Sequence, residues 1–102
     1  MASRGALRFS EDDNVATLLE DLTSGDEVQV RLGKETRMVQ ATEDIPFGFK
    51  IALTDIVKGA RIVKYGEPIG IASQDIRQGG MVHIHNLEGA RGRGDLTKGA
   101  IR

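Results

Sequence analysis

The sequence predicts a mainly β domain with one short helix near its N-terminus. Three observations support this class: a stretch with strand-like alternation, several short β-rich segments separated by Gly and Pro, and a turn motif that recurs four times. The chain has 102 residues, which is the length of one domain with one modest core.

The expected helix spans residues 14–22. Val15, Leu18, Leu19 and Leu22 follow the i, i+3, i+4, i+7 spacing of one helix face. Asp13 or Asn14 could cap the free backbone N–H groups at the start of this helix. Ser24-Gly25 would end it.

The strands are expected after this helix. Val28, Val30 and Leu32 alternate with polar residues, as in a half-buried strand. Gly33-Lys34 predicts a turn, and residues 36–41 a returning strand. Further strands are expected at residues 50–53, 61–65, 69–72 and 81–85.

The recurring motif is Asp, an aliphatic residue, two variable residues and Gly, with copies that begin at Asp21, Asp44, Asp55 and Asp75. We interpret each copy as a turn in which the carboxylate accepts from backbone N–H groups two or three residues later. The aliphatic residue would enter the core and the Gly would adopt positive φ. The alternative, that Asp and Gly are simply common in loops, explains two copies more easily than four.

Composition excludes several classes of function. The net charge of −1 and the absence of Trp argue against a nucleic-acid partner. The absence of Cys removes disulfides, thiolate metal sites and a Cys nucleophile. No apolar run reaches the roughly 20 residues that span a membrane, and no secretion signal is recognisable. We therefore expect a cytoplasmic protein without membrane partners.

The segment Met81–Asn86 is the first candidate for chemistry. If residues 81–85 form a strand, His83 and His85 share one face and lie roughly 7 Å apart. Such a pair could act as a base and a substrate donor, or as two metal ligands. Spacing identifies no third ligand. The alternative is two exposed histidines with no specific function.

Lys50 and Lys64 are the second candidates. Each lies close to a Gly at the edge of an expected strand, and Tyr65 follows Lys64. Lysine side chains suit the clamping of a substrate carboxylate. The alternative is that both lysines only make the surface soluble.

Four segments follow one another along the chain: residues 13–16 (DNVA), 44–53 (DIPFGFKIAL), 62–70 (IVKYGEPIG) and 83–86 (HIHN). Together they resemble the N-terminal SAF-type domain of the altronate and galactarate dehydratase family. They also resemble the small subunit of sulfolactate sulfo-lyase. The resemblance covers about residues 12–87. Residues 1–11 would then form an N-terminal extension and residues 88–102 a flexible Gly/Arg-rich tail.

The resemblance implies a β-clip fold and a part in the dehydration of sugar acids to 2-keto-3-deoxy acids. It implies catalytic roles for His83 and His85, and substrate binding by Lys50, Lys64, Tyr65, Asn86 and Asn14. A divalent metal, often iron, would be held mainly by a larger catalytic subunit. One departure is Phe49, because relatives usually carry His between the Gly and the Lys of this segment.

Three functions follow from these expectations. The chain could be the small subunit of a sugar-acid dehydratase, inactive alone and completed by a large catalytic subunit. It could instead be the small subunit of a sulfolactate sulfo-lyase, in which sulfite leaves in place of water. The third function is a non-catalytic module that binds a sugar acid or a partner. A homo-oligomer is compatible with each of them when the chain is isolated.

Overall fold

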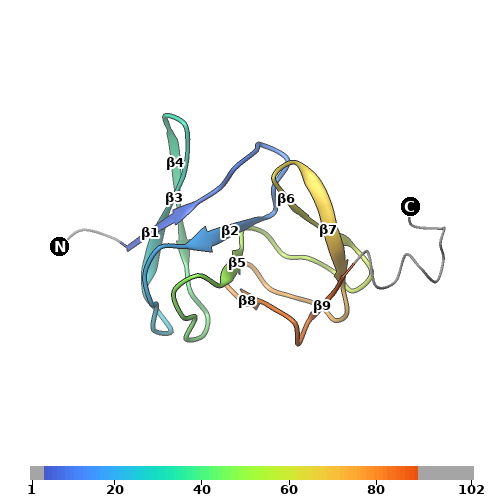
Figure 1. Cartoon of the computed structure of the whole chain (residues 1–102). Coiled ribbons are helices and arrows are strands. Elements are labelled where there is room, and N and C mark those ends of the chain that lie inside the picture. Colours follow the sequence, from blue (N-terminus) through green and yellow to red (C-terminus); the bar gives the residue numbers. More distant parts are fainter. Residues whose placement is uncertain (1–3, 90–102) are drawn as a thin grey trace.

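The computed structural model describes residues 4–89, and these form a mainly β structure without a helix (Figure 1). The mainly β prediction is therefore confirmed. In chain order the strands are β1 (Arg4–Leu7), β2 (Val15–Leu18), β3 (Glu27–Leu32), β4 (Glu35–Gln40), β5 (Lys50–Ala52), β6 (Arg61–Lys64), β7 (Glu67–Ala72), β8 (Met81–Val82) and β9 (Leu87–Gly89).

The strands form two sheets. The larger has the order β4-β3-β1-β2-β5-β8 and the smaller the order β6-β7-β9. Strands β1 and β3 run parallel, and the other pairs are antiparallel. Figure 1 shows the β3–β4 hairpin at one end of the molecule and the β6–β7 hairpin toward the other. The strands predicted between residues 27 and 72 are confirmed, with small shifts at their ends.

The four copies of the turn motif associate in two pairs. Leu22 and Ile45 exchange backbone hydrogen bonds of 2.8 and 3.0 Å in the first pair. Ile56 and Ile76 exchange two bonds of 2.7 Å in the second. All four side chains are buried. The prediction that the aliphatic residue of each copy enters the core is therefore confirmed.

The aspartates of the motif bond to the partner copy, which corrects the expectation that each would accept from its own turn. The bonds run from Phe47 N to Asp21, from Ser24 N to Asp44, from Gln78 N to Asp55 and from Lys58 N to Asp75, all at 2.8–2.9 Å. The antiparallel pairing explains the difference, because it places each carboxylate beside a donor at the partner's turn. Each copy therefore fixes the backbone of the other.

The glycines of the motif adopt the positive φ that the sequence predicted, between 87° and 94°. At Gly79 the space is restricted as well, because an added Cβ would lie 2.0 Å from Gln40 O. Gly79 N also donates to Ala52 O. Gly79 therefore holds the fourth copy against the end of β4, which a larger residue would prevent.

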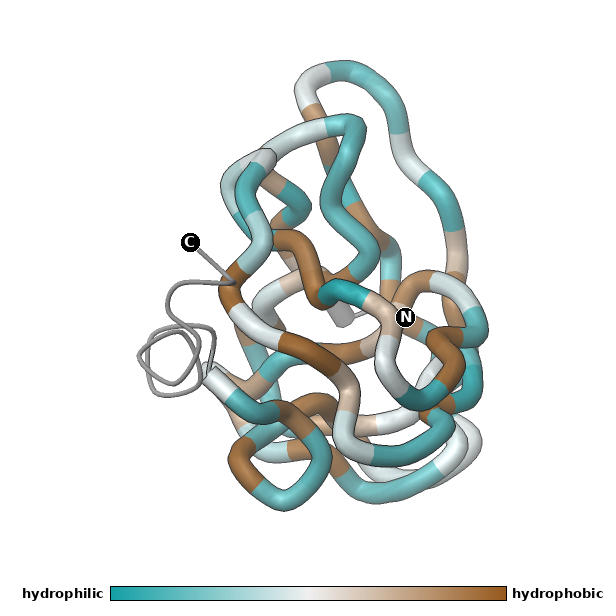
Figure 2. The backbone as a smooth tube through the Cα atoms, turned by 90° about the vertical axis from the view of Figure 1, so that its right-hand side faces the viewer, coloured by the Kyte–Doolittle hydropathy of each residue, from teal (hydrophilic) through white to brown (hydrophobic). Residues whose placement is uncertain are grey.

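Two groups of buried side chains form the core, one for each pair of turn copies. The first group is contributed by the β1–β4 region, β5 and the first pair, and consists of Ala6, Ala16, Leu18, Leu22, Val28, Val30, Val39, Ala41, Ile45, Ile51 and Leu53. The second lies between the two sheets and consists of Val15, Ala52, Ile56, Ile62, Ala72, Ile76 and Val82. In Figure 2 hydrophilic stretches lie on many of the outer loops, and several apolar stretches cross the interior.

The predicted helix at residues 14–22 is wrong. Residues Val15–Leu18 form β2, which is paired on both sides by β1 and β5. Val15 packs in the second buried group, whereas Ala16 and Leu18 pack in the first. A strand buried on both faces carries apolar residues at consecutive positions. Together with Leu22 of the next turn, Val15 and Leu18 of this strand reproduce the i, i+3, i+7 spacing of a helix face.

Strands also occupy parts of the predicted terminal segments. Residues 4–7, within the expected extension, form β1 between β2 and β3. Residues 87–89, at the start of the expected tail, form β9. Residues 90–102 of that tail lie outside the described part of the chain.

We predict that Asp55→Ala lowers the free energy of unfolding by about 1 kcal/mol, because Gln78 N–H loses its carboxylate acceptor. Urea unfolding would measure the change. Asp12→Ala is the matched control, since its exposed side chain makes no hydrogen bond among residues 4–89. Equal midpoints for Asp55→Ala and the unaltered protein would contradict the reciprocal capping.

Candidate functional site

Lys50 lies where the larger sheet meets the second buried group. In the register of the sheet it stands opposite Thr17 of β2 on one side and Val82 of β8 on the other. Directly opposed residues point to the same face of a sheet. The Lys50 side chain is partly buried as a result. Burial, and then the positive charge of Lys64, lower the pKa of Lys50 below its ordinary value.

Lys64, at the end of β6, brings a second cation toward Lys50. Its Nζ lies 4.8 Å from the ring centroid of Tyr65 and 5.8 Å from that of Phe9. The two rings are themselves in contact, with centroids 4.6 Å apart. Both rings keep substantial exposure, 43% for Phe9 and 60% for Tyr65. The ring faces attract the ammonium group and thereby orient Lys64.

A buried carboxylate fixes this aromatic surface. Asp13 accepts hydrogen bonds from Phe9 N (3.0 Å), Ser10 N (3.1 Å) and Gly66 N (2.8 Å). It thereby ties the loop that carries Phe9 to the tip of the β6–β7 hairpin. Tyr65 and Gly66 form that tip with φ of 61° and 74°, as a type I′ turn requires. A tyrosine at positive φ is uncommon, so the turn holds Tyr65 at some conformational cost.

Thr17 adds an unpaired oxygen beside Lys50. Within residues 4–89, Thr17 Oγ1 is buried and has no hydrogen-bond partner. Leaving such a hydroxyl unsatisfied costs about 1–3 kcal/mol. The oxygen is thus a polar atom that no group of the described chain uses, and because it is buried, a ligand at the Lys50 side chain would reach it only after neighbouring side chains moved. We refer to Lys50, Lys64 and Thr17 together as the lysine site.

Asn14 and Asn86, predicted to bind substrate, make structural hydrogen bonds. The Asn14 side chain accepts from Val63 N (2.8 Å) and donates to Arg61 O (3.0 Å), which fastens the edge of β6. Asn86 is buried and accepts from His83 N (2.9 Å) while it donates to Met81 O (2.8 Å). Both ends of each amide are thus bonded to backbone.

The strand geometry predicted for the histidines is wrong. Strand β8 ends at Val82, and Asn86 N donates to His83 O across a tight turn. The bonds of the Asn86 side chain stabilise that turn, so residues 83 and 85 do not alternate along a strand. The structure thus removes the geometric argument for a shared face, and catalytic roles for His83 and His85 stay predictions.

The surroundings of the two imidazoles differ. His83 is half-buried and stacks on Phe49, with ring centroids 4.1 Å apart. Phe49 packs against the first buried group. His85 is exposed and lines a hollow of about 270 Å³ together with Glu43 and Arg77. Phe49 thus places an aromatic contact beside His83, at the position where the sequence resemblance led us to expect another histidine.

The described residues do not form a metal site by themselves. Between residues 4 and 89 no three His, Cys, Asp or Glu side chains gather in an arrangement that could hold a metal ion. Two histidines from a turn would leave a tetrahedral or octahedral ion short of ligands. A metal at this surface would need ligands from outside residues 4–89.

The sequence pointed to Lys50, Lys64 and Tyr65 as candidates but not to Thr17 or Phe9, which the structure places near them. Thr17 is the one polar residue of β2, and the helix prediction hid its position opposite Lys50. Phe9 lies in the predicted extension, where no packing was expected. Two features of the sequence could have indicated them. Thr17 is an isolated polar residue in an apolar segment, and Phe9 is an aromatic residue in a polar segment.

Comparison with known proteins identifies the family. The family model described as the altronate/galactarate dehydratase SAF domain matches residues 4–90. The chain belongs to this family.

No helix among residues 4–89 is long and apolar enough to cross a membrane.

The relatives differ in the share of their own length that this chain matches. Altronate dehydratase of Escherichia coli K12 is 50% identical over 74 residues, which are 72% of this chain and 14% of the relative. That of Bacillus subtilis 168 is 41% identical over 82 residues, 80% of this chain and 16% of the relative. The (2R)-sulfolactate sulfo-lyase subunit alpha of Paracoccus pantotrophus is 43% identical over 51 residues, 50% of this chain and 76% of the relative. The chain thus spans about one seventh of the dehydratases it matches.

We predict that Lys64→Met raises the pKa of Lys50, because it removes one of the two causes that lower it. The pKa should stay below its ordinary value, since burial is the larger cause. NMR titration of the Lys50 side chain would measure it, with Lys58→Met as a control at an exposed turn whose charge is not among the causes of the shift. An unchanged pKa in Lys64→Met would contradict the proximity of the two cations.

The same shift has a definite sign for stability. The folded-state pKa of Lys50 lies below its unfolded value, so folding disfavours the charged form. The resulting penalty is complete below the lowered pKa. It disappears as the pH rises from there through the ordinary value of a lysine.

Proposed function

We propose that this chain acts as the small subunit of a sugar-acid hydro-lyase of the altronate dehydratase type. It would contribute substrate-binding residues to a larger catalytic subunit and be inactive alone. The lysine site carries this proposal. Two neighbouring ammonium groups, with no carboxylate partner among residues 4–89, and an unpaired hydroxyl are complementary to the carboxylate that every sugar acid contains.

The family membership supports the reaction class. Relatives that share 50% and 41% identity with this chain are named altronate dehydratases. The matched part of those relatives is a small fraction of their length, so most of each enzyme lies outside it. We infer that the residues of a large partner complete the active site next to the lysine site.

The chemistry fits a charge-stabilising role for the lysines. Loss of water beside a carboxylate requires removal of an α-proton, protonation of the departing hydroxyl and stabilisation of enolate-like negative charge. Lys50 and Lys64 would bind the carboxylate and oppose that charge, and Thr17 Oγ1 would donate to it. His83 and His85 stay in the proposal as separate candidates for proton transfer. A divalent metal such as iron, if required, would be held by the large subunit.

A sulfo-lyase is the second candidate function. Two relatives named (2R)-sulfolactate sulfo-lyase subunit alpha match this chain over 60% and 76% of their own lengths. This proportion favours an organisation in which an SAF domain is a separate subunit. Sulfolactate also carries a carboxylate, so the lysine site would serve either substrate. In both cases we expect a β-clip fold and a cytoplasmic enzyme.

We predict that a double substitution, Lys50→Met with Lys64→Met, lowers kcat/KM about a hundredfold, because two charge-assisted contacts to the carboxylate are lost. The assay would use Escherichia coli altronate dehydratase in which this chain replaces the matching segment. Altronate and galactarate would be compared in this chimera, and sulfolactate would be assayed with the Paracoccus pantotrophus sulfo-lyase in which this chain replaces subunit alpha. The host enzyme that this chain renders active would separate the dehydratase from the sulfo-lyase.

The control is Lys58→Met, which removes a lysine from an exposed turn outside the lysine site. It should leave kcat/KM within about twofold of the unaltered chimera. Unchanged turnover in the Lys50/Lys64 double variant would contradict a substrate role and favour a non-catalytic binding module. Full turnover by the large part without any SAF segment would contradict the subunit proposal altogether.

A further inference from the structure

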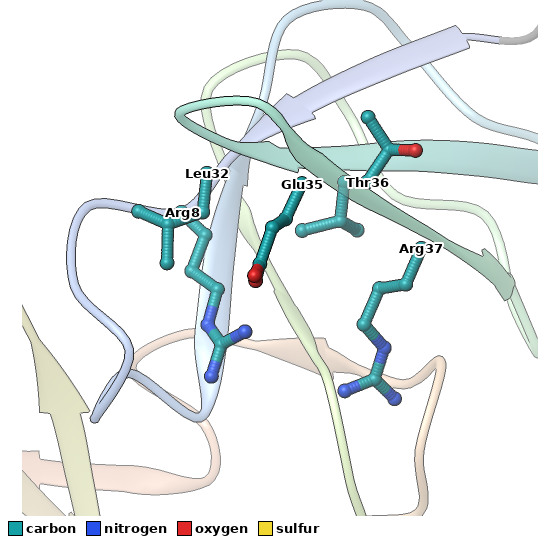
Figure 3. A pocket seen from close by; sticks show the side chains of 6 residues that line it. Arg8, Leu32, Glu35, Thr36 and Arg37 are labelled. Carbon is teal, nitrogen blue, oxygen red and sulfur yellow. The ribbon is translucent and has the colours of Figure 1, made fainter.

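A small pocket opens on the core-facing side of the larger sheet, beyond the first buried group. It has a volume of about 70 Å³ and is lined by Arg8, Val30, Leu32, Glu35, Thr36 and Arg37 (Figure 3). The register of β3 and β4 pairs Leu32 with Glu35 and Val30 with Arg37. Charged residues thus continue the face on which Val28 and Val39 are buried.

Both arginines of the pocket are held in place by neutral backbone oxygens. Arg8 donates from Nε to Asp13 O (3.2 Å) and from Nη2 to Glu11 O (2.6 Å). Arg37 donates from Nη2 to Leu53 O (2.7 Å). Carbonyl oxygens carry no net charge, so these bonds fix the guanidinium groups without neutralising them.

The remaining N–H groups of the two arginines are available. A guanidinium carries five N–H donors, and the bonds above use two from Arg8 and one from Arg37. Figure 3 shows Glu35 extending between the two arginines. Glu35 nevertheless forms no ion pair with Arg8 or Arg37 within the described chain. Since Glu35 carries one negative charge, these three side chains give the pocket a net charge of +1, with guanidinium donors that no carboxylate of residues 4–89 occupies.

We propose that this pocket, the arginine pocket, binds one small oxyanion, the carboxylate or phosphate group of a small molecule, between Arg8 and Arg37. The planar, multiply donating guanidinium matches both groups. The volume admits a single such group rather than an entire sugar acid. Glu35 opposes the ligand by like charge and limits its affinity. This site is separate from the lysine site and does not rest on the proposed function.

The test is an NMR titration of the full chain with inorganic phosphate and, separately, with acetate, at up to about 50 mM. The Nε–Hε signals of Arg8 and Arg37 should shift and saturate with at least one of the two anions. The comparison also shows which oxyanion the pocket prefers. Arg37→Gln should weaken binding about tenfold, since it removes a charge and a donating fork.

Two further variants make the result decisive. Glu35→Gln keeps every arginine contact and should strengthen binding about threefold, because one opposing charge is lost. Arg61→Gln removes an exposed arginine of β6 outside the pocket and should leave the affinity unchanged. The proposal is overturned if neither anion shifts the arginine signals. It is also overturned if Arg37→Gln and Arg61→Gln weaken binding equally, or if Glu35→Gln leaves the affinity unchanged.

Discussion

Reciprocal hydrogen bonding between paired turns is the constraint on which the fold depends. In each pair, the carboxylate of one copy holds the backbone of the other, as Asp21 and Asp44 do. The buried aliphatic residues of the first pair join one core group and those of the second pair join the other. The pairing thus anchors two small cores in a chain that has no helix among residues 4–89. Strand β2 lies between these cores and contributes to both.

Most of the strands and all four turn copies could be predicted, because alternation and turn residues are local signals. The partner of each Asp could not, because the pairing joins segments far apart in the chain. The helix prediction failed for a related reason, since burial of β2 on both faces depends on β1 and β5. The strand predicted through His83 and His85 was wrong because the Asn86 side chain closes a turn directly after a two-residue strand.

The lysine site is a product of the two-core arrangement. Lys50 comes from the larger sheet and Lys64 from the smaller, and each lies at the margin of the second core group. Both lysines could be named as candidates from the sequence. Their proximity and the lowered pKa of Lys50 could not, because both depend on how the two sheets meet. Thr17 joins them through the register of β2 and β5. Asn14 supports the arrangement by bonding β6.

The most direct measurement is a crystal structure of the chain in complex with a large dehydratase subunit and altronate. The substrate carboxylate should lie within about 3 Å of Lys50 Nζ or Lys64 Nζ, with Thr17 Oγ1 directed toward the same group. A complex in which the partner alone surrounds the carboxylate, while both lysines face solvent, would contradict this expectation.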